Sequence, residues 1–197
     1  VLSKKGLCMR PFTIHRFEKR CVIPPTITLS LENSILMMQG PLGKVELHLK
    51  TYDTLGDYSV KLVQKGRNQQ ELHLRTQSED GQKALQTLAS LVSQYIEGLT
   101  KGFFVSVELV GIGFKANFGA DRVELRVGYS HPVELIVPND VKVFVPKPTL
   151  VCLFGVSKKR VSQVAATLKA LKPVEPYKGK GIQLKDEITA RKVGKKK

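Results

Sequence analysis

The sequence predicts an α+β protein with two tandem copies of a mostly antiparallel sheet, each with one packed helix, and with basic extensions at both ends. Three observations support this fold class: a weak internal repeat, two amphipathic helical segments, and several short stretches with strand-like alternation. Single helices among short strands are typical of helices packed on one face of an antiparallel sheet. The 197 residues suffice for two small domains, since a domain usually has roughly 100–150 residues.

The internal repeat is seen when GPLGKVEL at residues 40–47 is aligned with GYSHPVEL at residues 128–135. Each segment follows a run that reads as a strand, and each copy then ends with a strand and a helix. The similarity is weak and chance matches of this size occur, but the shared order of elements favours a duplicated unit. The predicted division is a first domain at residues 23–101 and a second at residues 102–172.

Two segments have the periodicity of amphipathic helices. The first lies near residues 79–97, where Ser78 is a candidate cap and Gly98 is expected just past the helix end. The second lies near residues 158–172, with Ser157 as its candidate cap and a proline directly after it.

Most of the remaining sequence reads as short strands, and apolar residues alternate with polar ones at residues 105–109, 123–127 and 141–145. The expected strand segments are residues 35–38, 71–75, 105–109, 123–127, 141–145 and 150–154. Gly119, Ala120 and Asp121 are expected to form a turn between two of them.

The positive charge is concentrated at the two ends of the chain. Lys and Arg number 32 against 17 Asp and Glu, a net charge of +15. Residues 1–23 hold six basic residues and one acid, residues 155–197 hold thirteen and three, and residues 24–154 hold thirteen of each. A neutral body with basic ends is typical of a protein that lays its ends along a phosphate backbone. An anionic membrane surface is the other polyanion that such a charge fits.

The two terminal segments are predicted to behave as extensions. Residues 1–22 form a basic N-terminal extension, and residues 173–197 form a basic tail rich in Pro, Gly and Lys. Because the tail has little apolar area to bury, we expect it to become ordered only on its partner. Residues 1–20 contain Glu18 as their sole acid, which fits the neighbourhood of an organellar targeting segment or a basic tail without a targeting role.

Several function classes find no support in the sequence. No apolar run approaches the roughly 18–20 residues that a membrane helix needs. The three cysteines lack disulfide or zinc spacing, and the four histidines form no metal motif or nucleophile–base set. Asp53 and Asp57 have no third metal ligand and are expected to be surface loop charges. The GxGxxA pattern in VGIGFKA is followed by strand-like alternation and not by the helix that a dinucleotide site requires.

Three segments of the second half carry recognisable motifs: VELVGIGFKA at residues 107–116, LRVGYSHPVEL at residues 125–135 and EPYKGKGI at residues 175–182. They resemble the universal large-subunit ribosomal protein six family in its bacterial and organellar form. The resemblance covers roughly residues 22–197 and is strongest over residues 100–197, and EPYKGKGI is its most specific segment. It implies a duplicated sheet-and-helix fold without enzymatic activity or cofactor. It also implies a structural role in the large ribosomal subunit and binding to large-subunit rRNA near the sarcin–ricin loop. The partners implied are that rRNA, neighbouring ribosomal proteins and nearby translation factors.

The chain departs from the family pattern at several positions. Ser157 stands where the family has an acidic residue, Ser162 and Gln163 replace a Gly–Gln pair, and residues 172–174 replace an arginine pair before the EPYKGKG segment. These departures cast doubt on individual RNA contacts. They suggest a divergent lineage, which favours a mitochondrial ribosome, with plastid or bacterial cytoplasm as alternatives.

The candidate RNA-binding residues lie in the second helix and the tail. In the EPYKGKGI segment, glycines allow close approach of the backbone to phosphates, lysines supply charge, and the tyrosine can stack on a base. Three basic residues at the start of the second helix oppose its dipole, and a phosphate bound there would remove that conflict. The alternatives are a solvated tail and a solvated helix face. The candidates are Lys158, Lys159, Arg160, Tyr177, Lys178, Gly179, Lys180, Gly181, Arg191, Lys192, Lys195 and Lys196, with Lys197 beside them.

The loop at Gly128–Pro132 is another family landmark, and His131 has two interpretations. One is a binding role. The favoured one is a turn whose Gly and Pro set its geometry, with a half-buried histidine satisfied locally.

Three functions compete at this stage. The leading one is a structural ribosomal protein that neutralises rRNA phosphates with its basic ends. The second is an RNA-processing enzyme, which should carry clustered carboxylates or a poised histidine. The third is an RNA chaperone or regulator outside the ribosome.

Overall fold

The computed structural model describes residues 17–52, 59–64, 70–119 and 122–194. The chain divides into two compact units, one with the described parts of residues 1–25, 29–37 and 46–93, the other with those of residues 26–28, 38–45 and 94–197. The expected domain boundary near residue 101 stays a prediction. Ala120, Asp121, Asp53 and Asp57, named above in turn and loop roles, lie outside the described residues.

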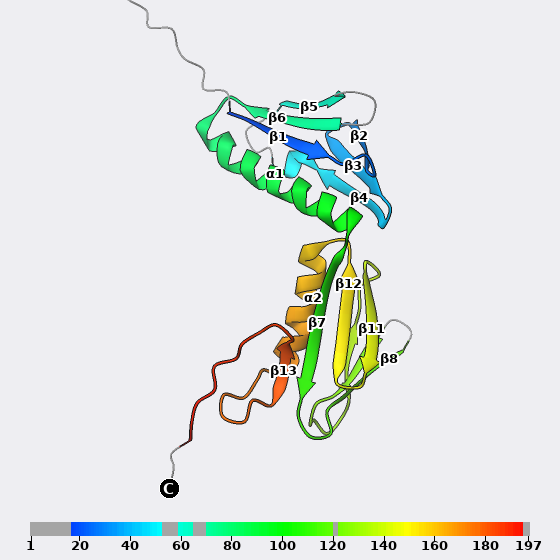
Figure 1. The fold of residues 1–197 in the computed structure, drawn as a ribbon, viewed down its shortest axis with the longest axis vertical. Coiled ribbons are helices and arrows are strands. Elements are labelled where there is room, and N and C mark those ends of the chain that lie inside the picture. Colours follow the sequence, from blue (N-terminus) through cyan, green and yellow to red (C-terminus); the bar gives the residue numbers. More distant parts are fainter. Residues whose placement is uncertain (1–16, 53–58, 65–69, 120–121, 195–197) are drawn as a thin grey trace, which may run out of the picture. The chain divides into compact units, whose positions relative to one another are not determined.

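The first copy of the fold has two three-stranded sheets and one long helix (Figure 1). The strand orders are β1-β6-β5 and β2-β3-β4, and the pairs β1–β6 and β5–β6 are antiparallel. The elements are β1 (Phe17–Ile23), β2 (Thr28–Glu32), β3 (Ile35–Gly40), β4 (Gly43–His48), the short 3-10 helix η1 (Leu49–Thr51), β5 (Ser59–Gln64), β6 (Gln70–Thr76) and α1 (Glu79–Thr100).

The second copy repeats this order with one extra strand. Its sheets are β11-β12-β7-β13 and β10-β9-β8, and neighbouring strands in both sheets pair antiparallel. The elements are β7 (Phe103–Val110), β8 (Lys115–Gly119), β9 (Arg122–Arg126), β10 (Val133–Ile136), β11 (Val141–Lys147), β12 (Leu150–Gly155), α2 (Lys158–Leu171) and β13 (Gly181–Leu184).

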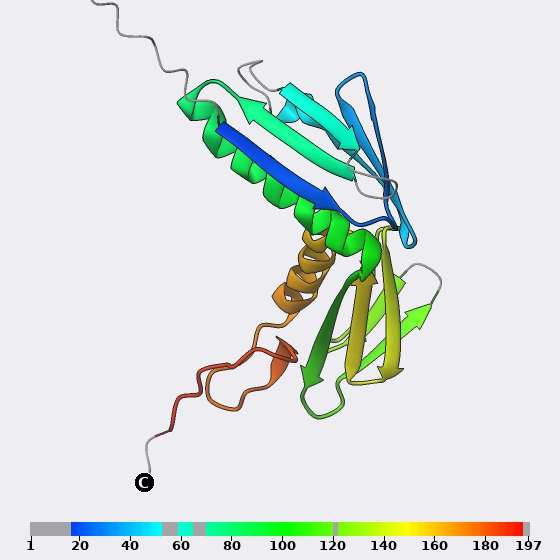
Figure 2. The ribbon, with the colours of Figure 1, turned by 45° about the horizontal axis from the view of Figure 1, so that its top comes forward.

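The two copies correspond strand by strand, which supports the duplication inferred from the repeat. β7 takes the place of β1, β8 to β10 that of β2 to β4, β11 and β12 that of β5 and β6, and α2 that of α1. Both views show α1 running along the sheet of β1 and β6 (Figures 1 and 2). The predicted class, an α+β fold with mostly antiparallel sheets and one helix per copy, is confirmed.

The helix α1 begins as predicted and ends later than predicted. The Ser78 Oγ accepts the N–H of Gly81 at 3.2 Å, which confirms Ser78 as the cap. Gly98 was expected just past the end but lies inside the helix. The end is set by Gly102, whose φ is +76° and whose N–H points to the carbonyl of Glu97 at 3.3 Å. Such a left-handed residue closing a helix favours glycine.

The helix α2 ends at Leu171, one residue before the expected end. Ser157 occupies the cap position with extended backbone, but its side chain makes no capping hydrogen bond. Its carbonyl accepts the N–H of Val161 at 3.1 Å. The expected side-chain cap is therefore wrong, and no acidic residue lies in the first turn of α2 to replace it.

The tail is better ordered within the chain itself than the sequence suggested. Gly181 to Leu184 form β13, which pairs antiparallel with β7. Ile182 is 1% exposed and belongs to the core of the second copy. The expectation that residues 173–197 become ordered only on a partner is thus wrong for this strand. Pairing along the edge of β7 and burial of Ile182 both hold it.

The N-terminal strand likewise reaches further than the sequence division allowed. β1 pairs with β6 from Phe17↔Thr76 to Ile23↔Gln70, so residues 17–22, assigned above to the extension, lie in the first sheet. Cys21 and Ile23 on this strand are buried. Backbone pairing explains this strand, since its sequence FEKRCVI carries more charge than a typical strand.

Alternating residues of the strands and one face of α2 form the core of the second copy. Val107, Leu109, Val151 and Leu153 of β7 and β12 are at most 4% exposed and pack with Leu168 of α2. Each such side chain contributes about 1.5–3 kcal/mol when fully buried. Among the described residues, no helix has the length and apolar character needed to cross a membrane.

Candidate nucleic-acid interface

The C-terminal segment forms a closed loop before β13. The N–H of Glu175 donates to the carbonyl of Lys180 at 2.8 Å, and the N–H of Gly179 donates to the carbonyl of Glu175 at 2.9 Å. Lys178 and Lys180 are exposed, and Tyr177 is 58% exposed. With these backbone groups already hydrogen-bonded to one another, the loop offers its side chains to a partner.

The backbone geometry of this loop favours glycine at both Gly179 and Gly181. Gly179 has a φ of +67°, in the left-handed region. A Cβ on Gly181 would lie 2.6 Å from the Cα of Val174, which is too close for any other residue. Gly181 is buried in β13, and the Gly179 N–H is already bonded within the loop. Both glycines therefore shape the loop. That their N–H groups donate to phosphates stays a prediction.

Residues 191 and 192 return to the same loop. The N–H of Lys192 donates to the carbonyl of Pro176 at 3.0 Å. The guanidinium of Arg191 lies where a side chain on Gly179 would reach, 3.1 Å from the Cβ position. The structure thus brings together five predicted residues, defined here as the tail cluster: Tyr177, Lys178, Lys180, Arg191 and Lys192. Lys195 and Lys196 lie outside the described residues.

Two further contacts anchor the tail to the second copy, and a third, from Glu187 to Leu184, lies within the tail. The Lys169 Nζ of α2 forms an ion pair with the Glu187 carboxylate, and this contact lowers the pKa of Glu187. The N–H of Lys185 donates to the carbonyl of Ser106 on β7 at 3.0 Å, and the N–H of Glu187 donates to the carbonyl of Leu184 at 3.0 Å. Glu187 is one of three acids among residues 155–197, and its charge is used to hold the tail in place.

The second predicted cluster lies at the other end of α2. Lys158, Lys159 and Arg160 are exposed in a first turn that contains no acidic residue. The Lys158 Nζ lies 6.0 Å from the centroid of the Phe103 ring, at the limit of a cation–π contact. A helix of 14 residues is about 20 Å long at 1.5 Å per residue, so this cluster and the tail cluster flank α2 without joining.

In the Gly128–Pro132 loop, Tyr129 and not His131 makes the contact that holds the loop. His131 is exposed, so the prediction of a half-buried histidine is wrong. Tyr129 donates from its hydroxyl to the carbonyl of Leu171 at 2.8 Å, and the Lys172 Nζ lies 4.9 Å above its ring. Tyr129 therefore closes the C-terminal end of α2 just before the tail. The available signal in the sequence was an aromatic residue directly after Gly128, whose φ is +82°.

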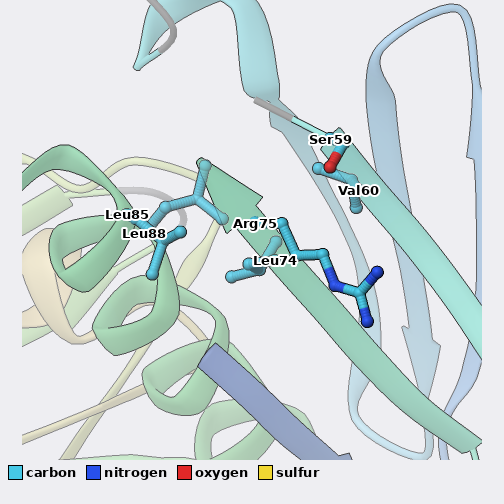
Figure 3. A pocket seen from close by; sticks show the side chains of 6 residues that line it. All are labelled: Ser59, Val60, Leu74, Arg75, Leu85 and Leu88. Atoms are coloured by element: carbon cyan, nitrogen blue, oxygen red, sulfur yellow. The ribbon is translucent and has the colours of Figure 1, made fainter. Parts of the chain in front are cut away.

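The described residues contain neither a metal-ligating group of three side chains nor the strand–helix turn of a dinucleotide site. After Val110 the chain turns through Gly111 and Gly113 into β8, so the GxGxxA pattern lacks the helix of a dinucleotide site, as predicted. No group of three metal-ligating side chains is found among the residues that the structure describes. Figure 3 shows a hollow between α1 and β6, where Leu85 and Leu88 face Leu74. Its volume of about 10 Å³ would hold roughly one water molecule.

Comparison with known proteins gives a consistent result across nearly the whole chain. A family model described as Ribosomal protein L6 matches residues 110–185. Relatives named Large ribosomal subunit protein uL6 include one from Rhodopseudomonas palustris (strain HaA2), 34% identical, covering 91% of this chain and 97% of the relative. The relative from Beijerinckia indica is 36% identical, covering 91% and 97%, and that from Nitrobacter winogradskyi is 37% identical, covering 92% and 99%. This chain belongs to the family of large ribosomal subunit protein uL6.

Proposed function

We propose that this protein is a structural constituent of the large ribosomal subunit that binds large-subunit rRNA through its second copy and tail. Its relatives are named as large ribosomal subunit proteins, and the family is structural and non-enzymatic. The observation that carries the proposal is the tail cluster. Five residues picked from the sequence as RNA contacts converge on one exposed loop anchored to β7 and α2.

The proposed mechanism is electrostatic. Lys178, Lys180, Arg191 and Lys192 neutralise rRNA phosphates and release the counterions condensed on them. Tyr177, exposed on the same loop, stacks on an unpaired base. The basic turn at Lys158–Arg160 adds a second phosphate contact at the opposite end of α2, where the helix dipole also favours an anion. Because β13 and the Lys169–Glu187 pair fix the loop beforehand, less ordering entropy opposes binding.

The finer assignments belong to the same proposal. The rRNA site lies near the sarcin–ricin loop, next to the region where translation factors dock, with neighbouring ribosomal proteins as further partners. The ribosome is that of a mitochondrion, as the departures at Ser157, Ser162 and Gln163 suggest. The relatives named above are bacterial, so a bacterial or plastid ribosome is the alternative that source identification would decide.

Sedimentation of native extract on a sucrose gradient tests the proposal. We expect the protein to travel with the large subunit at moderate salt and to leave it as salt rises, since the contacts are mainly ionic. Protein that stays at the top of the gradient in moderate salt would contradict the ribosomal role and favour an RNA chaperone outside the ribosome.

A further inference from the structure

The strand β11 presents a Lys–Phe–Lys row on one face of its sheet. Lys142, Phe144 and Lys147 pair with β12 at alternate positions, and their partners are Phe154, Cys152 and Leu150. Since alternate residues of a strand share a face, all three side chains lie on the same side. A bulge between Phe144 and Lys147 is what brings the second lysine to this side, because simple alternation would turn it away.

This side of the sheet faces away from the core. The alternating neighbours on β11 and β12, such as Val143 and Val151, are buried among the residues that pack with α2. On the opposite side, Phe144 is 53% exposed and Phe104 of β7 is 62% exposed. Phe104 pairs with a β12 residue of the same face, so the two rings share it.

A hollow lies beside this row at the edge of the sheet. It has a volume of about 850 Å³ and is lined by Phe144 and Pro146 of β11 and by Phe118 of β8, which is 42% exposed. We call Phe104, Lys142, Phe144 and Lys147 the β11 face, and Phe118 of the other sheet borders it across the hollow. The exposed rings beside this open hollow are surfaces on which a planar partner can stack.

The duplicated fold shows that this aromatic character is not a structural requirement. The corresponding face of β1, β6 and β5 in the first copy carries paired charged side chains beside the exposed aliphatic Val22 and Val63, and has no Phe, Tyr or Trp. The Glu18 carboxylate accepts from Arg20 Nε at 3.2 Å and from Arg75 Nη2 at 3.2 Å, and lies 2.9 Å from His73 Nδ1. The fold therefore does not require rings at this sheet position, and the exposed rings in the second copy suggest a partner.

The charge around the β11 face identifies the kind of partner. β11 holds Lys142 and Lys147 and no Asp or Glu, and Glu108 of β7 shares this face two strands away, in the row that runs through Leu150 to Lys147. This local excess lies inside the region whose total charge is zero, residues 24–154. Lysines are depleted at protein–protein interfaces, whereas exposed aromatic rings between basic groups are typical of surfaces that bind single-stranded nucleic acid.

We propose that the β11 face binds unpaired nucleotides of RNA, with bases stacked on Phe144 and its neighbouring rings and with phosphates neutralised by Lys142 and Lys147. The inference rests on the proposed rRNA-binding function and adds a contact separate from the tail cluster. Stacking tolerates any base, so the site discriminates unpaired from paired RNA and has little sequence preference.

Binding of a fluorescein-labelled RNA of about ten uridines, followed by anisotropy, tests this proposal in a length range typical of such sites. The parent protein for this assay is the full chain with Lys178, Lys180, Arg191 and Lys192 each replaced by Gln, so that the tail cluster contributes little to RNA binding. We expect Phe144→Ser to weaken binding about 5- to 150-fold, the equivalent of one lost base stack. Phe144→Leu, which keeps an apolar side chain without a ring, is expected to weaken binding as well.

The matched control is Ile136→Ser on β10, where an equally apolar side chain is 71% exposed away from the β11 face. It is expected to bind like the parent chain. Unchanged binding by Phe144→Ser, or an equal loss in Ile136→Ser, would overturn the proposal while leaving the rRNA role of the tail intact. Unfolding curves of all variants exclude loss of the fold as the cause.

Crosslinking in assembled large subunits distinguishes RNA from a protein partner. A photoreactive phenylalanine analogue at position 144 is expected to give an RNA adduct, whereas the same analogue at position 136 is not. An adduct of position 144 with a neighbouring protein would overturn the RNA assignment.

Discussion

At the scale of single residues, Lys178 and Lys180 offer their side chains for binding, while the backbone of the tail loop maintains its structure. Their side chains are exposed, while the backbone around them is closed by the Glu175–Lys180 and Gly179–Glu175 hydrogen bonds. Replacing both lysines with Gln should leave the unfolding free energy within about 0.5 kcal/mol of the parent, since surface changes of this kind are usually small.

The same double variant should bind rRNA more weakly and with a shallower salt dependence. Each lost phosphate contact is expected to reduce the slope of log K against log salt by about 0.7–0.9. Titration of a large-subunit rRNA fragment at several salt concentrations measures this slope. Lys50→Gln, an exposed lysine of the first copy, is the control, and an equal change there would show that only net charge matters.

The Lys169–Glu187 pair predicts a pH dependence. The ion pair lowers the pKa of Glu187, so its stabilising effect is present above the ordinary glutamate pKa and is lost as the pH falls through the lowered value. The stability difference between the parent chain and Glu187→Gln should therefore be greatest near pH 7 and vanish in acid. Denaturant unfolding of both proteins across this range measures it, and a difference that stays constant with pH would contradict the assignment.

At the scale of elements, β13 decides whether the tail is held. Ile182 is 1% exposed in the core, so Ile182→Ala should destabilise the protein by about 2–5 kcal/mol. Ile188→Ala, at a position 98% exposed and six residues later, should change stability by no more than about 0.5 kcal/mol. Equal unfolding midpoints for the two variants would show that β13 does not pack as described.

Because β13 is part of the core, deleting the tail is a poor test of its RNA binding. Deleting everything from Pro173 removes buried Ile182 and the partner of Lys169 along with the basic residues. A loss of RNA binding after that deletion would mix lost charge with lost stability. Charge-neutralising substitutions in the tail cluster avoid this, because each side chain is exposed.

At the scale of the whole molecule, the segregation of charge predicts how the protein leaves its partner. The ends of the chain carry the net charge of +15, while residues 24–154 are neutral overall. Replacing Lys178, Lys180, Arg191 and Lys192 with Gln should shift release from the large subunit to lower salt in a sucrose gradient. Release at an unchanged salt concentration would mean that the first helical turn of α2 or the β11 face holds the protein on the subunit.

Periodicity and short motifs were sufficient to predict the fold class, the duplication and the cap at Ser78, whereas RNA binding by the tail residues stays a prediction. The confirmed features depend on neighbours in sequence: helical and strand spacing and a capping serine. They were insufficient where distant residues decide the outcome. The end of α1 depends on backbone geometry at Gly102, and the role of Tyr129 depends on a carbonyl at Leu171.

Tertiary structure alone decided the two features on which the proposed RNA contacts rest. The sequence of the tail reads as too polar to fold, yet the free edge of β7 supplies hydrogen bonds and a place in the core for Ile182. The Lys–Phe–Lys row requires a bulge that shifts Lys147 to the face of Phe144, and no local pattern reveals that shift. Sequence patterns record what each residue prefers, whereas pairing across strands determines which residues come to share a surface.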